Sequence, residues 1–149
     1  MRFKFSACVD ELKKLLEREK LTLVISDGKE YFTSREKGIR PLLNFAESGK
    51  SFRGFAAADK IVGKAAALLY AFIGISALYA EVITHDAVRV CDIYGISVAF
   101  GVLTDKIVNR EGNGLCPMEE AVSSVNEPNS AVRAVKNRLN ELRANNASD

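Results

Sequence analysis

The segment ADKIVGKAAALL, which begins at residue 58, places two lysines four positions apart. On a predicted helix over residues 59–72, with Asp59 as its N-cap, Lys60 and Lys64 share one face of the first turns. Cations there oppose the helix dipole and repel each other, and each effect costs roughly 0.3–1 kcal/mol or less. A small anion held at this helix N-terminus would offset those costs, so the segment predicts an anion-binding site.

Gly63 supports that prediction, because a glycine inside a helix costs roughly 0.5–1 kcal/mol relative to alanine and lets a ligand approach the backbone. The alternative is that Asp59 neutralises Lys60, Lys64 extends into solvent, and the glycine permits close packing on a strand. The segment is not a P-loop, which needs a glycine at position 58 and a hydroxyl side chain at position 65. ATP hydrolysis is therefore not predicted.

The segment NREGNGLCPME, residues 109–119, holds a cysteine at the start of a predicted helix. Cys116 falls at or just before the N-cap, Pro117 suits the first helical position, and Glu119 suits the third. The helix dipole would stabilise the thiolate of Cys116 and make it more nucleophilic. The alternative is a small apolar side chain buried ahead of the helix. Cys116 and Lys64 are the candidate catalytic residues.

Glycines allow the loop before this cysteine to bend around a ligand. Gly112 and Gly114 permit positive φ on either side of Asn113, so the loop can turn its N–H groups inward as an anion nest. The predicted ligand-binding residues are Asp59, Lys60, Gly63, His85, Asn109, Arg110, Gly112, Gly114 and Glu119.

His85 is the only histidine and sits at a predicted strand-to-helix junction, where open α/β sheets place catalytic groups. It could act as an acid or base, or it could cap the helix or pair with Asp86. The chain has no C-x-x-C, H-x-E or H-E-x-x-H pattern, and its three cysteines are widely spaced. These spacings predict neither a metal site nor a metal cofactor, and no other cofactor is predicted.

The length of 149 residues suits one domain, expected over residues 1–149 with frayed ends at 1–5 and 144–149. A formal net charge of +2 is too balanced to predict nucleic-acid binding. The uncharged run at residues 65–80 is shorter than the roughly 20 residues that cross a membrane, so no membrane association is predicted. Scattered cysteines and an N-terminus without an apolar signal region favour the cytoplasm.

Hydrophobic periodicity and turn residues predict an α/β fold. A hairpin turning at Asp27 and Gly28 is followed by helices and then by a strand–helix–strand unit, which is typical of a parallel crossover. The order predicts three layers, with a mixed sheet that starts with an antiparallel hairpin and is flanked by helices. The expected elements are an amphipathic opening helix, hairpin strands within 21–34, a short helix from Pro41, a central helix over 59–72, a strand over 77–83, a helix over 86–94 capped by Thr84, a strand over 96–102, and helices over 117–125 and 129–142.

Three segments resemble a small prokaryotic family of unknown function in the cytidine deaminase-like superfamily. They are ADKIVGKAAALLY at 58–70, GIRPLLNF at 38–45 and IVNREGNGLCPMEEAV at 107–122, and the resemblance spans about residues 8–142. It implies a cytidine deaminase-like fold, in agreement with the predicted elements. It does not imply zinc-dependent deamination, because the H-x-E or C-x-E and P-C-x-x-C residues of zinc deaminases are missing here.

Three hypotheses follow. The first is a zinc-independent protein that binds a small anionic or nucleotide-like ligand between the lysine-bearing helix start and the loop over residues 109–116. The second is a group-transfer enzyme with Cys116 as nucleophile or sulfur carrier, as in superfamily relatives that lost zinc. The third is a non-catalytic interaction module that forms a homo-oligomer through its end helices.

Overall fold

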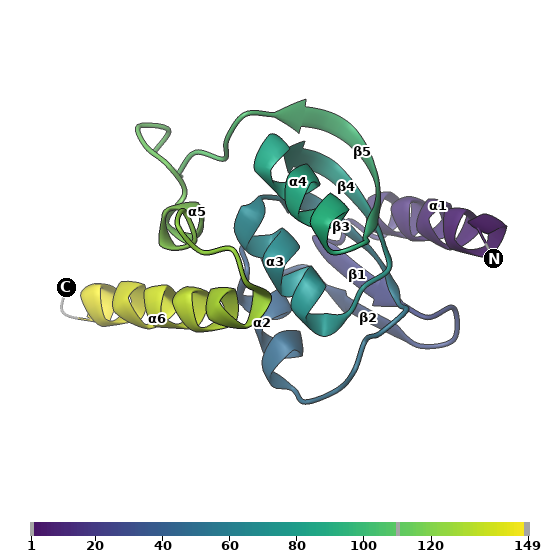
Figure 1. The fold of residues 1–149 in the computed structure, drawn as a ribbon, viewed down its shortest axis with the longest axis horizontal. Helices are drawn as coiled ribbons and strands as arrows, with labels where there is room; N and C mark the ends of the chain where they lie inside the picture. Colours follow the sequence, from purple (N-terminus) through teal and green to yellow (C-terminus); the bar gives the residue numbers. More distant parts are fainter. Residues whose placement is uncertain (1, 110, 148–149) are drawn as a thin grey trace.

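The structure is a computed structural model that describes residues 2–109 and 111–147. It contains a five-stranded sheet with helices on both faces (Figure 1). The strands are β1 (Leu23–Ser26), β2 (Tyr31–Ser34), β3 (Ala56–Val62), β4 (Ala77–Thr84) and β5 (Ser97–Thr104). The helices are α1 (Arg2–Arg18), α2 (Arg40–Glu47), α3 (Lys64–Ile73), α4 (His85–Ile93), α5 (Pro117–Ala121) and α6 (Pro128–Ala147).

The sheet has the strand order β2-β1-β3-β4-β5. β1 pairs antiparallel with both β2 and β3, whereas β3, β4 and β5 are parallel to one another. The predicted architecture is confirmed: three layers, with a mixed sheet that begins with an antiparallel hairpin. The predicted strand–helix–strand unit is β4-α4-β5, and its crossover is parallel as expected.

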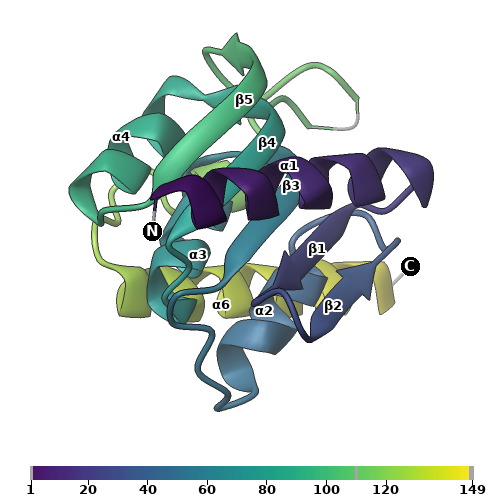
Figure 2. The ribbon, with the colours of Figure 1, turned by 90° about the vertical axis from the view of Figure 1, so that its right-hand side faces the viewer.

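Helix α1 alone crosses one face of the sheet, while α2, α3 and α4 cover the other, with α6 outside them (Figures 1 and 2). The two faces have separate apolar cores. The larger lies between the sheet and α3, whose residues are buried almost all round. The smaller lies under α1 and contains Leu12, Leu16 and Tyr79. Burial on both faces explains why the central strands carry few polar residues.

The predicted helix over residues 59–72 is wrong in its first third. Residues 56–62 form the central strand β3, and α3 begins only at Lys64, after Gly63 as N-cap. Lys60 is therefore an exposed strand residue, and its side chain does not share a helical face with Lys64. Asp59 is not a helix cap either. A segment rich in alanine, with apolar residues at both spacings, fits strand and helix alike by periodicity.

Asp59 instead bonds the central strand to the central helix. Its Oδ2 accepts a 2.6 Å hydrogen bond from the hydroxyl of Tyr70, which is fully buried on α3. Burial raises the pKa of Asp59 from 3.8 to about 6, although the bonds from Tyr70 and from backbone N–H groups favour the charged form. Burial also holds the pKa of Tyr70 well above its usual value, so the phenol remains the donor.

Within the described residues, helix α1 begins at Arg2 and α6 ends at Ala147. The predicted fraying also covers residues 1, 148 and 149, which lie outside the described residues. The last two predicted helices are present as α5, shorter than expected, and α6, longer than expected. Among the helices in the described ranges, none combines the length and apolar character that a membrane crossing requires.

We expect the stability of the fold to fall as the pH rises from about 4 to about 6. In this window the unfolded chain has lost the Asp59 proton while the folded chain keeps it, because the folded pKa is about 6. Below the window both states hold the proton, and above it both have lost it. Urea unfolding at a series of pH values would measure a drop of at most about 3 kcal/mol.

Two variants isolate this carboxyl. Asp59→Asn should flatten the slope between pH 4 and 6, since the titrating group is gone. Tyr70→Phe removes a donor that favours the carboxylate, so the upper end of the slope should move to higher pH. An unchanged slope in Asp59→Asn would assign the effect to another group.

Candidate functional site

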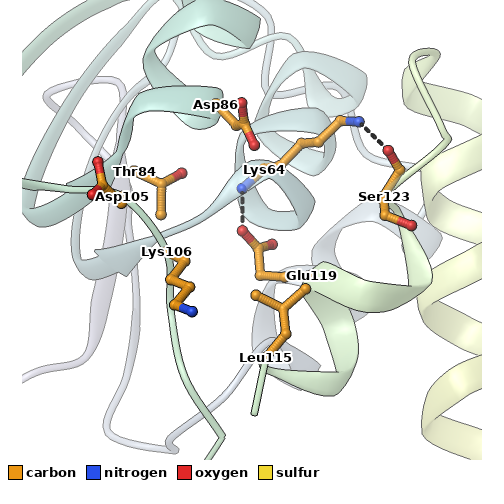
Figure 3. A pocket seen from close by; sticks show the side chains of 8 residues that line it. All are labelled: Lys64, Thr84, Asp86, Asp105, Lys106, Leu115, Glu119 and Ser123. Carbon is orange, nitrogen blue, oxygen red and sulfur yellow. Dashed lines mark hydrogen bonds between the residues drawn. The ribbon is translucent and has the colours of Figure 1, made fainter.

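A pocket of about 120 Å³ lies where the carboxyl ends of the parallel strands meet the N-termini of α3 and α4 (Figure 3). Open α/β sheets bind ligands at this edge. One wall comes from the ends of β4 and β5, and the opposite wall comes from α5 and the residues around it. The lining residues are Lys64, Thr84, Asp86, Asp105, Lys106, Leu115, Glu119 and Ser123.

The N-terminus of α3 is occupied by a carboxylate of the chain itself. Glu119, on α5, accepts hydrogen bonds from the backbone N–H of Lys64 at 2.8 Å and of Ala65 at 2.9 Å, one to each oxygen (Figure 3). An anion at this position satisfies two free helix donors and complements the helix dipole. The lysine-bearing segment that begins at residue 58 and the cysteine-bearing segment at residues 109–119 are therefore in contact. The Glu119 carboxylate is the anion at the helix start.

Gly63 makes this contact possible. A Cβ atom at position 63 would lie 2.2 Å from Oε1 of Glu119, closer than any van der Waals contact allows. The glycine is the N-cap, in ordinary extended conformation, and is not inside a helix as predicted. The space left by the missing side chain holds the Glu119 carboxylate, whereas the sequence predicted a small anionic ligand there.

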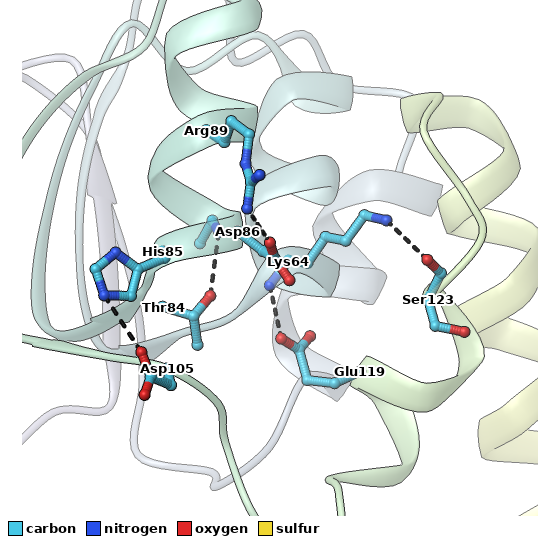
Figure 4. A network of polar contacts seen from close by, with 9 residues as sticks. Lys64, Thr84, His85, Asp86, Arg89, Asp105, Glu119 and Ser123 are labelled. Atoms are coloured by element: carbon cyan, nitrogen blue, oxygen red, sulfur yellow. Dashed lines mark hydrogen bonds and ion pairs between the residues drawn. The ribbon is translucent and has the colours of Figure 1, made fainter.

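Each carboxylate that lines the pocket has a partner (Figure 4). Glu119 is bound to the start of α3. Asp86 pairs with Arg89, and Asp105 lies 3.4 Å from Nε2 of His85, which is itself exposed and outside the pocket lining. Thr84 caps α4 as predicted, accepting a 3.1 Å bond from the N–H of Ala87.

The two lysines that line the pocket differ from its carboxylates in having no charged partner among the described residues. Lys64 donates from Nζ to the backbone oxygen of Ser123 at 3.3 Å, a neutral acceptor. Within the described residues, neither Lys64 nor Lys106 takes part in an ion pair. The pocket therefore holds two ammonium groups whose charge no carboxylate of the described chain neutralises by direct contact.

The glycine-rich loop is a self-contained hairpin and not an open anion nest. An antiparallel bridge between Val108 and Leu115 closes it. The N–H groups of Asn109, Gly112 and Asn113 donate to oxygens of Gly114 and Asn109. Only Gly112 has a positive φ; Gly114 has not, although both were expected to allow it. Arg110, a predicted ligand residue, lies outside the described residues.

The remaining predicted site residues lie away from the pocket lining. Cys116 is the N-cap of α5, with Pro117 next, as predicted, but the thiol is half-buried against the large apolar core. Lys60 and Asp59 lie on β3, and Asn109, Gly112 and Gly114 lie in the exposed hairpin. Of the predicted residues, Lys64 and Glu119 line the pocket.

Sequence reasoning missed Lys106, Asp105 and Ser123 as pocket residues. Asp105 and Lys106 follow directly on β5, and the carboxyl ends of parallel strands share one edge of the sheet. Their position after the predicted strand over 96–102 was a usable signal. No sequence pattern around Ser123 indicates a pocket residue. It lines the pocket because of the way α5 packs.

The pocket does not fit a zinc ion. Three carboxylates line it, and each is already engaged, while no cysteine or histidine lines it. Among the described residues, no group of three or more His, Cys, Asp and Glu side chains is placed to hold a metal. Structural and catalytic zinc sites need at least three such ligands.

Fold and site together define a three-layer α/β domain with a small polar pocket at the carboxyl ends of three parallel strands. Family comparison makes the assignment specific. The model of a family described as TM1506, a domain of unknown function (DUF1893), matches residues 11–139. The chain belongs to this family.

Solved structures agree with this assignment. A DUF1893 family protein from Thermotoga maritima is 25% identical, with a TM-score of 0.82 over 89% of this chain and 90% of that one. A dCMP deaminase from the cyanophage S-TIM5, solved with dCMP and dUMP, is 11% identical, with a TM-score of 0.42 over 64% of this chain and 94% of its own. The latter likeness is too distant to bear on function. No curated protein matches the chain.

We expect Gly63→Ala to destabilise the protein by about 1–2 kcal/mol, similar to the loss of a helix cap. The added Cβ displaces the flexible Glu119 carboxylate from the two N–H groups of α3. Glu119→Ala should cost a similar amount, and the double variant should cost little more than either alone. Urea unfolding measures all three.

Glu120→Ala is the matched control. Its carboxylate is the next along α5, but it forms a surface ion pair with Arg138 and should contribute less than about 1 kcal/mol. Full additivity of the Gly63 and Glu119 substitutions would mean that the two positions do not act through one contact.

Proposed function

We propose that the protein binds a small anionic metabolite in this pocket, without zinc, on a deaminase-like fold. The observation that carries the proposal is the charge state of the lining. Its carboxylates are engaged by a helix N-terminus, an arginine and a histidine, whereas the ammonium groups of Lys64 and Lys106 have no ionic partner within the described residues. An anion that contacts either ammonium group would pair with its charge.

The size of the pocket favours a small ligand. Drug-sized ligands occupy pockets of roughly 300–1,000 Å³, whereas this one has about 120 Å³. Phosphate or a short carboxylic acid suits that volume. A nucleotide would place only its anionic part inside, so the nucleotide-like ligand considered from the sequence is the less favoured form of the proposal.

The position of the pocket supports binding as well. It lies where the carboxyl ends of the parallel strands meet the starts of two helices, the edge at which open α/β sheets bind ligands. Lys60 has no part in the revised proposal, because it lies on β3 outside the lining. Group transfer by Cys116 gains no support from the geometry, since the thiol is half-buried outside the lining.

A thermal-shift screen with small carboxylates, inorganic phosphate, phosphorylated metabolites and nucleotides tests the proposal. We expect at least one small anion to raise the melting temperature, with higher salt weakening the effect. Lys64→Met and Lys106→Met should each weaken binding about tenfold or more, which corresponds to roughly 1.4 kcal/mol. Titration calorimetry with the best compound measures the affinities.

Lys60→Met provides the control, since it removes an equal charge from an exposed position outside the pocket. It should leave the affinity within about twofold of the unsubstituted protein. The proposal fails if no compound shifts the melting temperature, or if Lys60→Met weakens binding as much as the two pocket variants.

A further inference from the structure

The two edges of the sheet differ sharply in how well they are protected. β2 is a four-residue edge strand followed closely by the charged residues Arg35, Glu36 and Lys37. β5, at the other edge, has eight residues, SVAFGVLT, with no charge and no proline. Monomeric proteins usually blunt an edge strand by shortening it or by placing charge, proline or a bulge in it. β5 is not short, and it contains neither a charged residue nor a proline.

Exposed apolar side chains concentrate around this edge. Of the ten large apolar residues exposed in the described chain, seven lie between residues 93 and 115, in α4, β5 and the segment that follows. Phe100 is 43% exposed and Val102 is 56% exposed, both within the edge strand. A cluster of this kind marks an interaction surface more often than a surface with scattered apolar residues does.

An open groove of about 420 Å³ adjoins the start of the same strand, between β5 and α4. It is lined in part by Val88, Ile96 and Val98, with Cys91 at its buried side. Burial raises the pKa of the Cys91 thiol to about 12, so this side chain stays neutral and behaves as a small apolar group. Asp92 and Ser97 also line the groove, and its apolar part can accept an apolar side chain that arrives along the edge.

We propose that β5 pairs antiparallel with β5 of a second copy of this chain, joining two five-stranded sheets into one. Side chains alternate along a strand, so Val98, Phe100 and Val102 share one face. A two-fold axis at Phe100 sets Val98 of one copy against Val102 of the other, next to the groove, and sets the two Phe100 side chains against each other. These central pairs are apolar.

Charge and symmetry select a second copy as the occupant. In an antiparallel pair centred on Phe100, each residue meets the residue that lies equally far on the other side of the centre, so a strand without charged residues brings no like charges together. β5 carries none along its full length. Antiparallel self-pairing also closes at two copies, since each protomer uses its one unprotected edge, and the protected edge β2 stops the sheet from growing further.

Light scattering after size exclusion tests the proposal on the full chain. We expect a mass twice the 16.3 kDa of the protomer at concentrations of tens of micromolar, and a monomer for Val102→Lys, which puts a charge at an exposed edge position. Tyr31→Lys is the matched control, because it makes the same change at a half-exposed apolar residue of the opposite edge. It should remain dimeric.

Two readouts locate the interface without relying on the lysine variant. Phe100→Cys should form an interchain disulfide on oxidation, which the unsubstituted protein and Tyr31→Cys should not form. Hydrogen exchange of the unsubstituted protein should show β5 amides that lose protection on dilution, while β2 amides do not.

A monomer at these concentrations overturns the proposal. A dimer that persists in Val102→Lys, or that lacks both the Phe100→Cys cross-link and the dilution-sensitive protection of β5, also overturns it and assigns self-association to another face. Binding of an added extended peptide to β5 in a monomeric chain would assign the edge to a different partner.

Discussion

The contact between the Glu119 carboxylate and the start of α3 determines the shape of the candidate site. It joins residues 55 positions apart and holds α5 across the carboxyl ends of the parallel strands. The carboxylate satisfies two backbone donors that no residue within α3 can satisfy. It also leaves Lys64 without a carboxylate partner, because the negative charge is directed at the backbone. One contact therefore both places a wall of the pocket and leaves the Lys64 ammonium without an ionic partner there.

Much of the fold could be predicted from local patterns. Asp27 and Gly28 predicted the hairpin turn, Thr84 predicted the cap of α4, and the strand–helix–strand order predicted the parallel pair β4 and β5. The central strand β3 could not be predicted in this way. Its first three residues are buried alanines, and its second half, with Asp59 and Lys60, shows no strict alternation that would distinguish a strand from a helix.

The site shows the same division between local and long-range information. The predicted ligand site rested on Lys60, Gly63 and Lys64 sharing the start of one helix, and residues 56–62 are instead the strand β3. A carboxylate does occupy the helix start near Lys64. The identity of the anion depended on a contact with Glu119, which only the tertiary structure brings close. Lys106 was missed for a different reason: its role depends on the order of strands in the sheet, and that order requires β3.

The packing of α6 on α3 has a consequence for biosynthesis. α3 is apolar almost all round, and part of its outer surface is covered by α6, which begins at Pro128. A ribosome therefore completes the whole sheet and releases α3 from the exit tunnel before the helix that shields it has been made. During that interval the nascent chain exposes an apolar helix to solvent, the kind of segment that chaperones bind.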